Sequence, residues 1–80
     1  MSITVLFFAR YAEAVGFDSL EMEGDFATVE AVRLALAGDP DFDVLNETRL
    51  MCARNEELCG LDEPLQPGDE VAFFPPVTGG

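Results

Sequence analysis

The sequence contains no histidine, no lysine and no tryptophan, and its only basic side chains are four arginines. Histidine and lysine are the side chains most often used as a general base, a Schiff-base nucleophile or a phosphate clamp near neutral pH. Aspartate and glutamate can still act in catalysis. The missing residues therefore weigh against a self-sufficient enzyme without ruling one out.

Cysteine is also scarce, since Cys52 and Cys59 are the only two. They could form a disulfide or supply two ligands of a metal site. Two thiols without histidine fall short of a structural zinc site, and a secreted scaffold of this size usually carries at least about four cysteines. We therefore expect free, largely buried thiols and no metal site.

Long apolar runs and basic clusters are missing as well. No stretch approaches the roughly 18 apolar residues of a membrane span, and the opening "MSITVLFFAR" alternates like a strand instead of forming a signal segment. A cytoplasmic location is the expectation. The formal net charge of −12 repels nucleic-acid phosphates and anionic membranes, and it favours a basic protein partner.

What is present is enough for one small domain. Eighty residues, 49% of them hydrophobic, can fill a single core but not two. A short helix or a turn closed by Gly16 is expected at 10–15, and an amphipathic helix is expected from an N-cap at Thr28 to Gly38. Apolar alternation predicts strands at 3–9, 17–23, 49–54, 58–60 and 70–74.

Between the second helix and the third strand, residues 39–47 are predicted to form an acidic loop with a short turn. Three aspartates at alternate positions suggest the start of a calcium loop. An EF-hand needs glycine at its sixth position and glutamate at its twelfth, where this chain has Val44 and Leu50. A solvated acidic loop is therefore the better interpretation.

The two most apolar strands, "ITVLFFA" and "EVAFF", should lie side by side in the middle of one mixed sheet. The fold class is therefore α+β, a ubiquitin-like β-grasp with about five strands packed on one main helix. Residues 1–74 form the domain, because the prolines at 75 and 76 end the last strand. Residues 75–80 form a flexible, extended Gly-Gly tail.

Several segments carry a resemblance to a known family: "VLFFAR" at 5–10, "TVEAVR" at 28–33, "RNEE" at 54–57 and "GDEVAFFPPVTGG" at 68–80. On these motifs the chain resembles the small-subunit sulfur carriers of molybdopterin synthase, over nearly its whole length. Cys52 and Cys59 do not correspond to sulfur sites of that family.

The resemblance implies a carrier role for Gly80. A separate ubiquitin-activating-type adenylyltransferase would use ATP to adenylate its carboxylate, and a persulfide donor would supply sulfur, leaving 1-thioglycine. The large subunit of molybdopterin synthase would then use this sulfur on cyclic pyranopterin monophosphate to form the dithiolene of molybdopterin. The chain would be a non-catalytic subunit, with no permanently bound cofactor, in a heterotetramer.

The chemistry of the tail supports this interpretation independently. A terminal carboxylate has a pKa of about 3.5, so it is an anion and a poor electrophile until it is activated. Glycine lacks a Cβ and suits a narrow channel, and proline lowers the entropy lost on insertion. Six extended residues span at most roughly 20 Å. The residues expected to enter the partner with Gly80 are Pro75, Pro76, Val77, Thr78 and Gly79; a frayed, inert end is the alternative.

Docking requires a surface besides the tail. Strand parity places Phe8 and Phe74 together on the sheet face away from the helix, with Leu58 nearby, and the resemblance implies that such residues hold the large subunit. The alternative is that the chain itself covers this patch.

Other functions remain open at this point. A β-grasp carrier can serve thiamin, cysteine or tRNA thiolation, and a pure interaction module with an inert tail is a rival of another class. The missing lysine argues against a modifier that is joined to copies of itself through lysine.

Overall fold

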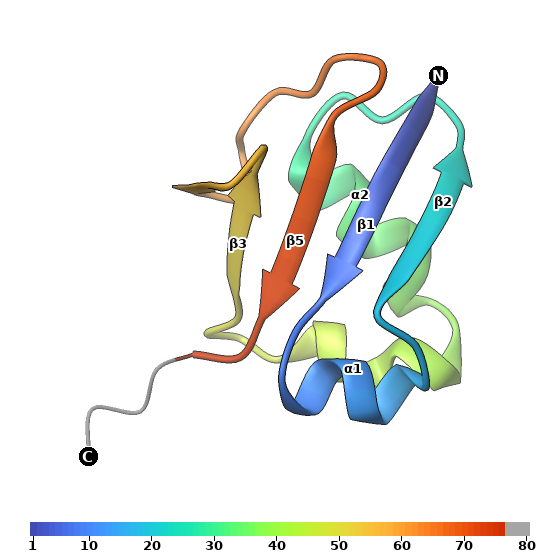
Figure 1. Ribbon diagram of the computed structural model, residues 1–80, viewed down its shortest axis with the longest axis vertical. Helices are drawn as coiled ribbons and strands as arrows, with labels where there is room; N and C mark the ends of the chain where they lie inside the picture. Colours follow the sequence, from blue (N-terminus) through green and yellow to red (C-terminus); the bar gives the residue numbers. More distant parts are fainter. Residues whose placement is uncertain (77–80) are drawn as a thin grey trace.

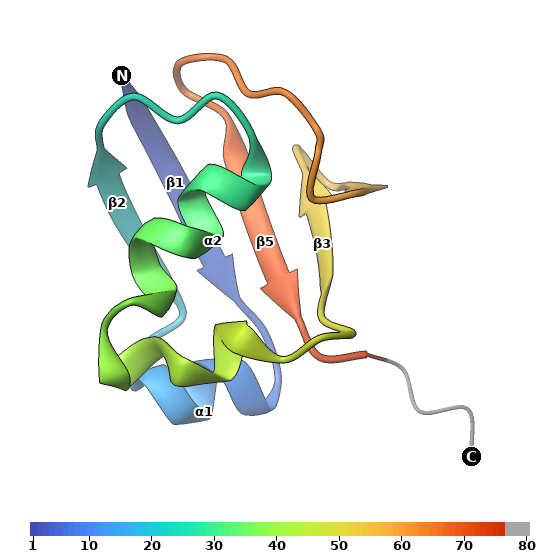
Figure 2. The ribbon, with the colours of Figure 1, turned by 180° about the vertical axis from the view of Figure 1, so that it is seen from behind.

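The computed structural model describes residues 1–76, so Val77, Thr78, Gly79 and Gly80 lie outside the described residues. The sheet has the order β2-β1-β5-β3-β4, and α2 crosses one of its faces (Figures 1 and 2). In chain order the elements are β1 (Ser2–Phe7), α1 (Arg10–Val15), β2 (Ser19–Glu23), α2 (Val29–Ala37), the 3₁₀ helix η1 (Pro40–Asn46), β3 (Met51–Arg54), β4 (Glu57–Cys59) and β5 (Glu70–Phe74).

The central pair of the sheet is β1 and β5, which run parallel with Val5 opposite Val71 and Phe7 opposite Phe73. The other neighbouring strands are antiparallel. A mixed sheet of five strands on one main helix confirms the predicted β-grasp fold and its central strands. The predicted flexibility of the tail concerns residues that are mostly outside the described part of the chain.

The core lies between the sheet and α2. Ile3, Val5 and Phe7 alternate on one face of β1 and are buried, as the period-two pattern predicts. Their partners from the helix are Val29, Val32 and Leu36. The Thr28 Oγ1 atom accepts a hydrogen bond from the Ala31 N–H at 3.2 Å, which caps the N-terminus of α2 as predicted.

The first strand is shorter than expected. It ends at Phe7, and Ala9 adopts a left-handed φ of 53° that turns the chain into α1. Helix α1 has the predicted bounds, and Gly16 closes it with a φ of 95°, which glycine adopts without steric cost. The prediction of a strand through residue 9 is therefore wrong at its end.

The predicted acidic loop at 39–47 is also corrected, because most of it is the helix η1. Asp39 caps this helix by accepting the Asp41 N–H at 2.9 Å, and Pro40 occupies its first position. Leu45 is fully buried, which fixes the segment to the core. Phe42 and Val44 also pack against the core, so several apolar side chains order this acidic segment.

The thiols are free, as predicted, with Cys52 buried and Cys59 half-buried. Among residues 1–76, no helix has the length and apolarity needed to cross a membrane. In the same part of the chain, no group of three or more His, Cys, Asp or Glu side chains is arranged to hold a metal ion.

Candidate functional site

The sheet face opposite α2 carries a shallow hollow of about 310 Å³, which we call the outer-face hollow. Apolar side chains form most of it, with two carboxylates at its edge. Its lining residues are Leu6, Phe8, Ala53, Glu56, Leu58, Glu70, Ala72 and Phe74.

The three residues predicted to bind a partner meet at this hollow. The Phe8 and Phe74 rings pack edge to face, with centroids 6.4 Å apart. Phe8 is 48% exposed and Leu58 is 69% exposed. Within the described residues the chain leaves this patch open, so the predicted placement of Phe8, Leu58 and Phe74 is confirmed; their role in binding stays a prediction.

The strand register explains why the surface is hollow here. Leu58 of β4 lies opposite Ala53 of β3, Ala53 lies opposite Ala72 of β5, and Ala72 lies opposite Leu6 of β1. Two methyl side chains thus form the floor between larger apolar neighbours. Strand parity puts Ala72 on the same face as Phe74, but sequence reasoning missed Ala53 and the floor itself, because only the register between separate strands brings the two alanines together.

The edge of the hollow is acidic. Glu56 and Glu70 line it, and Arg54, the nearest cation in sequence, is held in ion pairs with Asp69 and Glu63. With a net charge of −12 for the whole chain, an apolar floor within an acidic field suits a partner with an apolar protrusion and basic surroundings.

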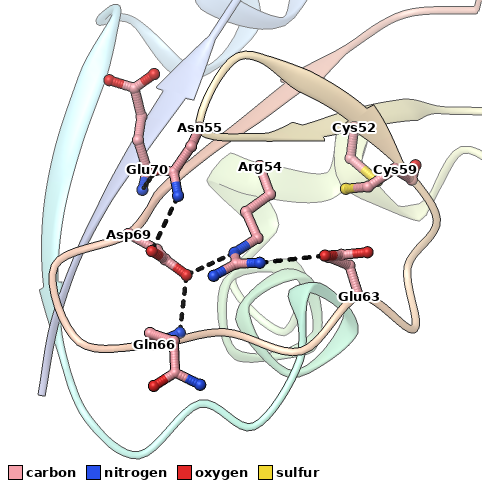
Figure 3. A network of polar contacts seen from close by, with 8 residues as sticks. All are labelled: Cys52, Arg54, Asn55, Cys59, Glu63, Gln66, Asp69 and Glu70. Carbon is pink, nitrogen blue, oxygen red and sulfur yellow. Dashed lines mark hydrogen bonds and ion pairs between the residues drawn. The ribbon is translucent and has the colours of Figure 1, made fainter.

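A buried carboxylate positions the β3–β4 hairpin that carries Leu58. Asp69 Oδ2 accepts hydrogen bonds from Arg54 Nε at 2.7 Å and from the Gln66 N–H at 2.8 Å, and Oδ1 accepts from Asn55 Nδ2 at 3.0 Å (Figure 3). Arg54 also reaches Glu63 at 3.3 Å. These contacts tie the hairpin to the segment that precedes β5.

The same contacts shift the titration of Asp69. The hydrogen bond from Asn55, together with those from Gln66 and Arg54, favours the ionised form over the opposing effect of burial and lowers the pKa of Asp69 to about 2. At neutral pH the group is an anion that is fully hydrogen-bonded. Sequence reasoning did not single it out.

The turn between β3 and β4 uses two left-handed residues, Asn55 with φ 49° and Glu56 with φ 70°. Asparagine tolerates this conformation, and here its side chain also accepts the Glu70 N–H at 2.9 Å while its backbone N–H donates to the Glu70 carbonyl at 2.8 Å. The turn is therefore joined to the first residue of β5.

The chain leaves the sheet at the end of β5 (Figure 1). Pro75 and Pro76 follow Phe74 without strand structure, as predicted from the missing backbone donor. Phe74 is therefore the last residue of the sheet and also a wall of the hollow. The predicted roles of Val77, Thr78, Gly79 and Gly80 concern residues outside the described part of the chain.

Comparison with known proteins adds a decisive observation: residues 5–80 match the ThiS family. The chain belongs to the ThiS family. It is 51% identical over 80 residues to the molybdopterin synthase sulfur carrier subunit of Escherichia coli K12, with 98% of this chain and 99% of the relative covered. This similarity to a protein with that name extends over nearly the full length of both chains.

Solved structures agree with this membership of the ThiS family. The chain superposes on SAMP1 from Haloferax volcanii with a TM-score of 0.80 at 32% identity, covering all of both chains. It also superposes on a chain from the complex of subunits 1 and 2 of the molybdopterin-converting factor of Helicobacter pylori, with a TM-score of 0.72 at 25% identity and complete coverage of both chains. These neighbours share the predicted ubiquitin-like fold.

Proposed function

We propose that this chain is the sulfur carrier subunit of a molybdopterin synthase and that Gly80 is the residue that carries the sulfur. The observation that carries the proposal is the 51% identity with a sulfur carrier subunit across 98% of the chain. The family match extends to residue 80 and so includes the Gly-Gly end.

The carrier chemistry follows from the carboxylate at the end of the chain. An adenylyltransferase consumes ATP and joins AMP to the Gly80 carboxylate, which makes its carbonyl carbon an electrophile. The outer sulfur of the donor persulfide then attacks this carbon and displaces AMP, which gives an acyl disulfide. A thiol of the donor system cleaves the acyl disulfide, which releases the thiocarboxylate on Gly80 and leaves a disulfide on the donor. The resulting sulfur anion is a soft nucleophile that attacks cyclic pyranopterin monophosphate and forms a thioester between the carrier and the substrate. Water then cleaves the acyl–sulfur bond, so that the sulfur stays on the substrate and Gly80 returns to a carboxylate, in two deliveries per dithiolene.

The proposed docking partner is the large subunit, in a heterotetramer. The related chain from Helicobacter pylori was solved in a complex of subunits 1 and 2. In this chain, the outer-face hollow is the proposed surface on which the large subunit docks. Because Phe74 is both a wall of the hollow and the last residue of β5, a partner seated there lies beside the start of the tail. We assign the acid–base groups of the reaction to that partner, which agrees with the lack of histidine and lysine in this chain.

Removal of Gly80 tests the proposal. The chain without Gly80 is incubated with the large subunit, the activating enzyme, ATP and a sulfur donor, and transfer of sulfur to cyclic pyranopterin monophosphate is measured. Transfer should fall to background because the next carboxylate is one residue, or roughly 3.5 Å, short of the reacting position.

Two controls separate loss of cargo from loss of docking. A chain extended by one residue beyond Gly80 should also fail in transfer, and both variants should bind the large subunit within about threefold of the unmodified chain, since the hollow is intact. Sulfur transfer by the shortened chain at the full rate would contradict the proposal. Transfer to a thiamin or tRNA precursor instead would assign the carrier to another pathway.

A further inference from the structure

The two cysteines lie directly opposite one another on the antiparallel strands β3 and β4. Their Sγ atoms are 3.9 Å apart, with the Cys59 thiol donating toward Cys52, and the Cys52 thiol donates to the Cys59 carbonyl at 3.3 Å. Figure 3 shows the two sulfur atoms side by side at the edge of the hairpin. The register therefore brings together two thiols that the carrier chemistry does not use.

The two thiols differ in their access to solvent. Cys52 is 3% exposed and packs in the core. Cys59 is half-buried and lines a polar cavity of about 270 Å³ together with Arg54, Asn55, Glu57, Leu58 and Glu63. The cavity therefore lies beside Cys59, the more exposed of the two residues, whereas Cys52 does not line it and is covered by the core.

We propose that Cys52 and Cys59 are a redox-active dithiol, which closes to an intrachain disulfide by exchange with a small-molecule disulfide such as oxidised glutathione. Cys59 is the attacking thiol, and Cys52 is the resolving thiol. This site is separate from Gly80 and does not depend on the proposed carrier function.

The exchange balances in two steps. The Cys59 thiolate attacks one sulfur of oxidised glutathione, forms a mixed disulfide and expels one glutathione thiolate. Cys52 then loses its proton to solvent and attacks the Cys59 sulfur, which breaks the mixed bond and expels the second glutathione thiolate. Two protein thiols are oxidised, and one small-molecule disulfide is reduced to two thiols.

The strand geometry permits closure with a small movement. Directly opposite residues in antiparallel strands have Cα atoms about 4.5 to 5.5 Å apart, which falls within the range of about 4.4 to 6.8 Å found for disulfides. The sulfurs must approach from 3.9 Å to about 2.05 Å. Strand β4 can supply this movement, because it has three residues and pairs only with β3 at the edge of the sheet.

The surroundings of the thiols set the conditions for the exchange. Burial raises the pKa of both, that of Cys52 to about 12. At Cys52 the neighbouring Cys59 adds most to this increase in pKa, followed by the carboxylates of Glu30 and Asp62. At Cys59 the hydrogen bond with Cys52 and the charge of Arg54 lower the pKa, while Glu63 and Asp62 raise it. Because the thiolate is the attacking species, the reaction should run slowly near neutral pH and faster in mild alkali.

A redox titration tests the proposal without any variant. The folded chain is equilibrated with mixtures of reduced and oxidised glutathione at about pH 8.5 and quenched in acid. Mass spectrometry then gives the fractions of dithiol, mixed disulfide and intrachain disulfide, and the titration is repeated in urea. The effective concentration of the two thiols should be at least about tenfold higher in the folded chain, because the register holds them in contact. An effective concentration in the fold that is equal to or below that of the unfolded chain would overturn the proposal.

Two matched serine variants test the assigned roles. In Cys52→Ser, glutathione should remain trapped on Cys59, since no resolving thiol is present. In Cys59→Ser, the remaining thiol is buried and should stay at least about tenfold less modified under folding conditions. Equal modification of the two variants, or a native chain that stops at the mixed disulfide, would contradict the assignment.

Discussion

Asp69 shows how much one side chain contributes to the arrangement of the candidate site. It is 7% exposed, and its carboxylate accepts hydrogen bonds from Arg54, Asn55 and the Gln66 N–H. Arg54 and Asn55 lie at the end of the β3–β4 hairpin, and Gln66 lies in the segment that precedes β5. Loss of the charge leaves these donors without their anionic acceptor, in a place that water reaches poorly.

The isosteric variant Asp69→Asn is expected to lower the free energy of unfolding by about 2 kcal/mol at pH 7, a value that follows from the depressed pKa. Urea denaturation measures it. The matched control is Asp25→Asn, which removes the same charge from an exposed residue and should leave stability nearly unchanged. Equal losses in the two variants would mean that total charge, not the contacts of Asp69, sets the effect.

The same carboxylate predicts a pH dependence. The pKa of folded Asp69 lies near 2, below its ordinary value of 3.8, so its stabilising contribution is present above pH 3.8 and is lost as the pH falls through about 2. The difference in stability between the native chain and Asp69→Asn should therefore shrink over this interval. A difference that stays constant down to pH 2 would contradict the assigned cause.

Prediction from the sequence was uneven at the scale of residues. Phe8 and Phe74 could be placed by strand parity, since alternation depends only on local geometry, and Leu58 was expected near them. Asp69 could not be recognised among 16 acidic residues, because its burial depends on partners that lie 3 to 15 positions away along the chain. The alanine floor of the hollow depends in the same way on pairing between distant strands.

At the scale of elements, the turn between β3 and β4 holds a non-glycine residue in an unfavourable backbone conformation. Glu56 has a φ of 70°, and a side chain with a Cβ pays roughly 1 to 2 kcal/mol in this region. Glu56→Gly should therefore raise the free energy of unfolding by about 1 kcal/mol, less than the full cost because glycine also gains freedom in the unfolded chain. Thermal or urea unfolding checks this.

The neighbouring variant Glu57→Gly is the control. Glu57 is equally exposed but begins β4, where glycine should destabilise by about 0.5 to 1 kcal/mol. Opposite signs for the two substitutions are expected. Destabilisation by both would show that the left-handed conformation of Glu56 is not costly here.

Elements with local signals were predicted well. Helix α1 is closed by Gly16, α2 begins at its threonine cap, and β5 ends at two prolines. The segment 40–46 was missed as a helix because its acidic residues suggest a solvated loop, and because its order comes from the packing of Phe42, Val44 and Leu45 against the core. Tertiary contacts decide such segments.

At the scale of the whole molecule, the outer-face hollow is an open apolar surface on a strongly acidic chain. Leu58→Asp, at the 69% exposed side chain of the hollow, should weaken binding to the large subunit at least about tenfold, because it places a charge in a desolvated contact. Leu34→Asp is the matched control, since Leu34 is 58% exposed on α2, which covers the other face of the sheet (Figure 2). Isothermal titration calorimetry measures both affinities.

Equal loss of affinity in the two leucine variants would show that the outer-face hollow is not the docking surface.

The net charge of −12 further predicts that the association rate falls as salt increases, because long-range attraction to a basic partner is screened. Stopped-flow mixing of the chain with the large subunit at two ionic strengths gives this rate.

The most direct measurement of the central claim is the location of sulfur on the chain. The protein is incubated with ATP, the activating enzyme and a persulfide donor, and the intact chain is fragmented in a mass spectrometer. Replacement of one oxygen by sulfur adds nearly the mass of one oxidation, which three methionines and two cysteines can also acquire, so the added mass must be assigned to a residue. The account predicts that it lies on Gly80. A plain carboxylate on Gly80, with an activating system that charges a known carrier in parallel, would contradict it.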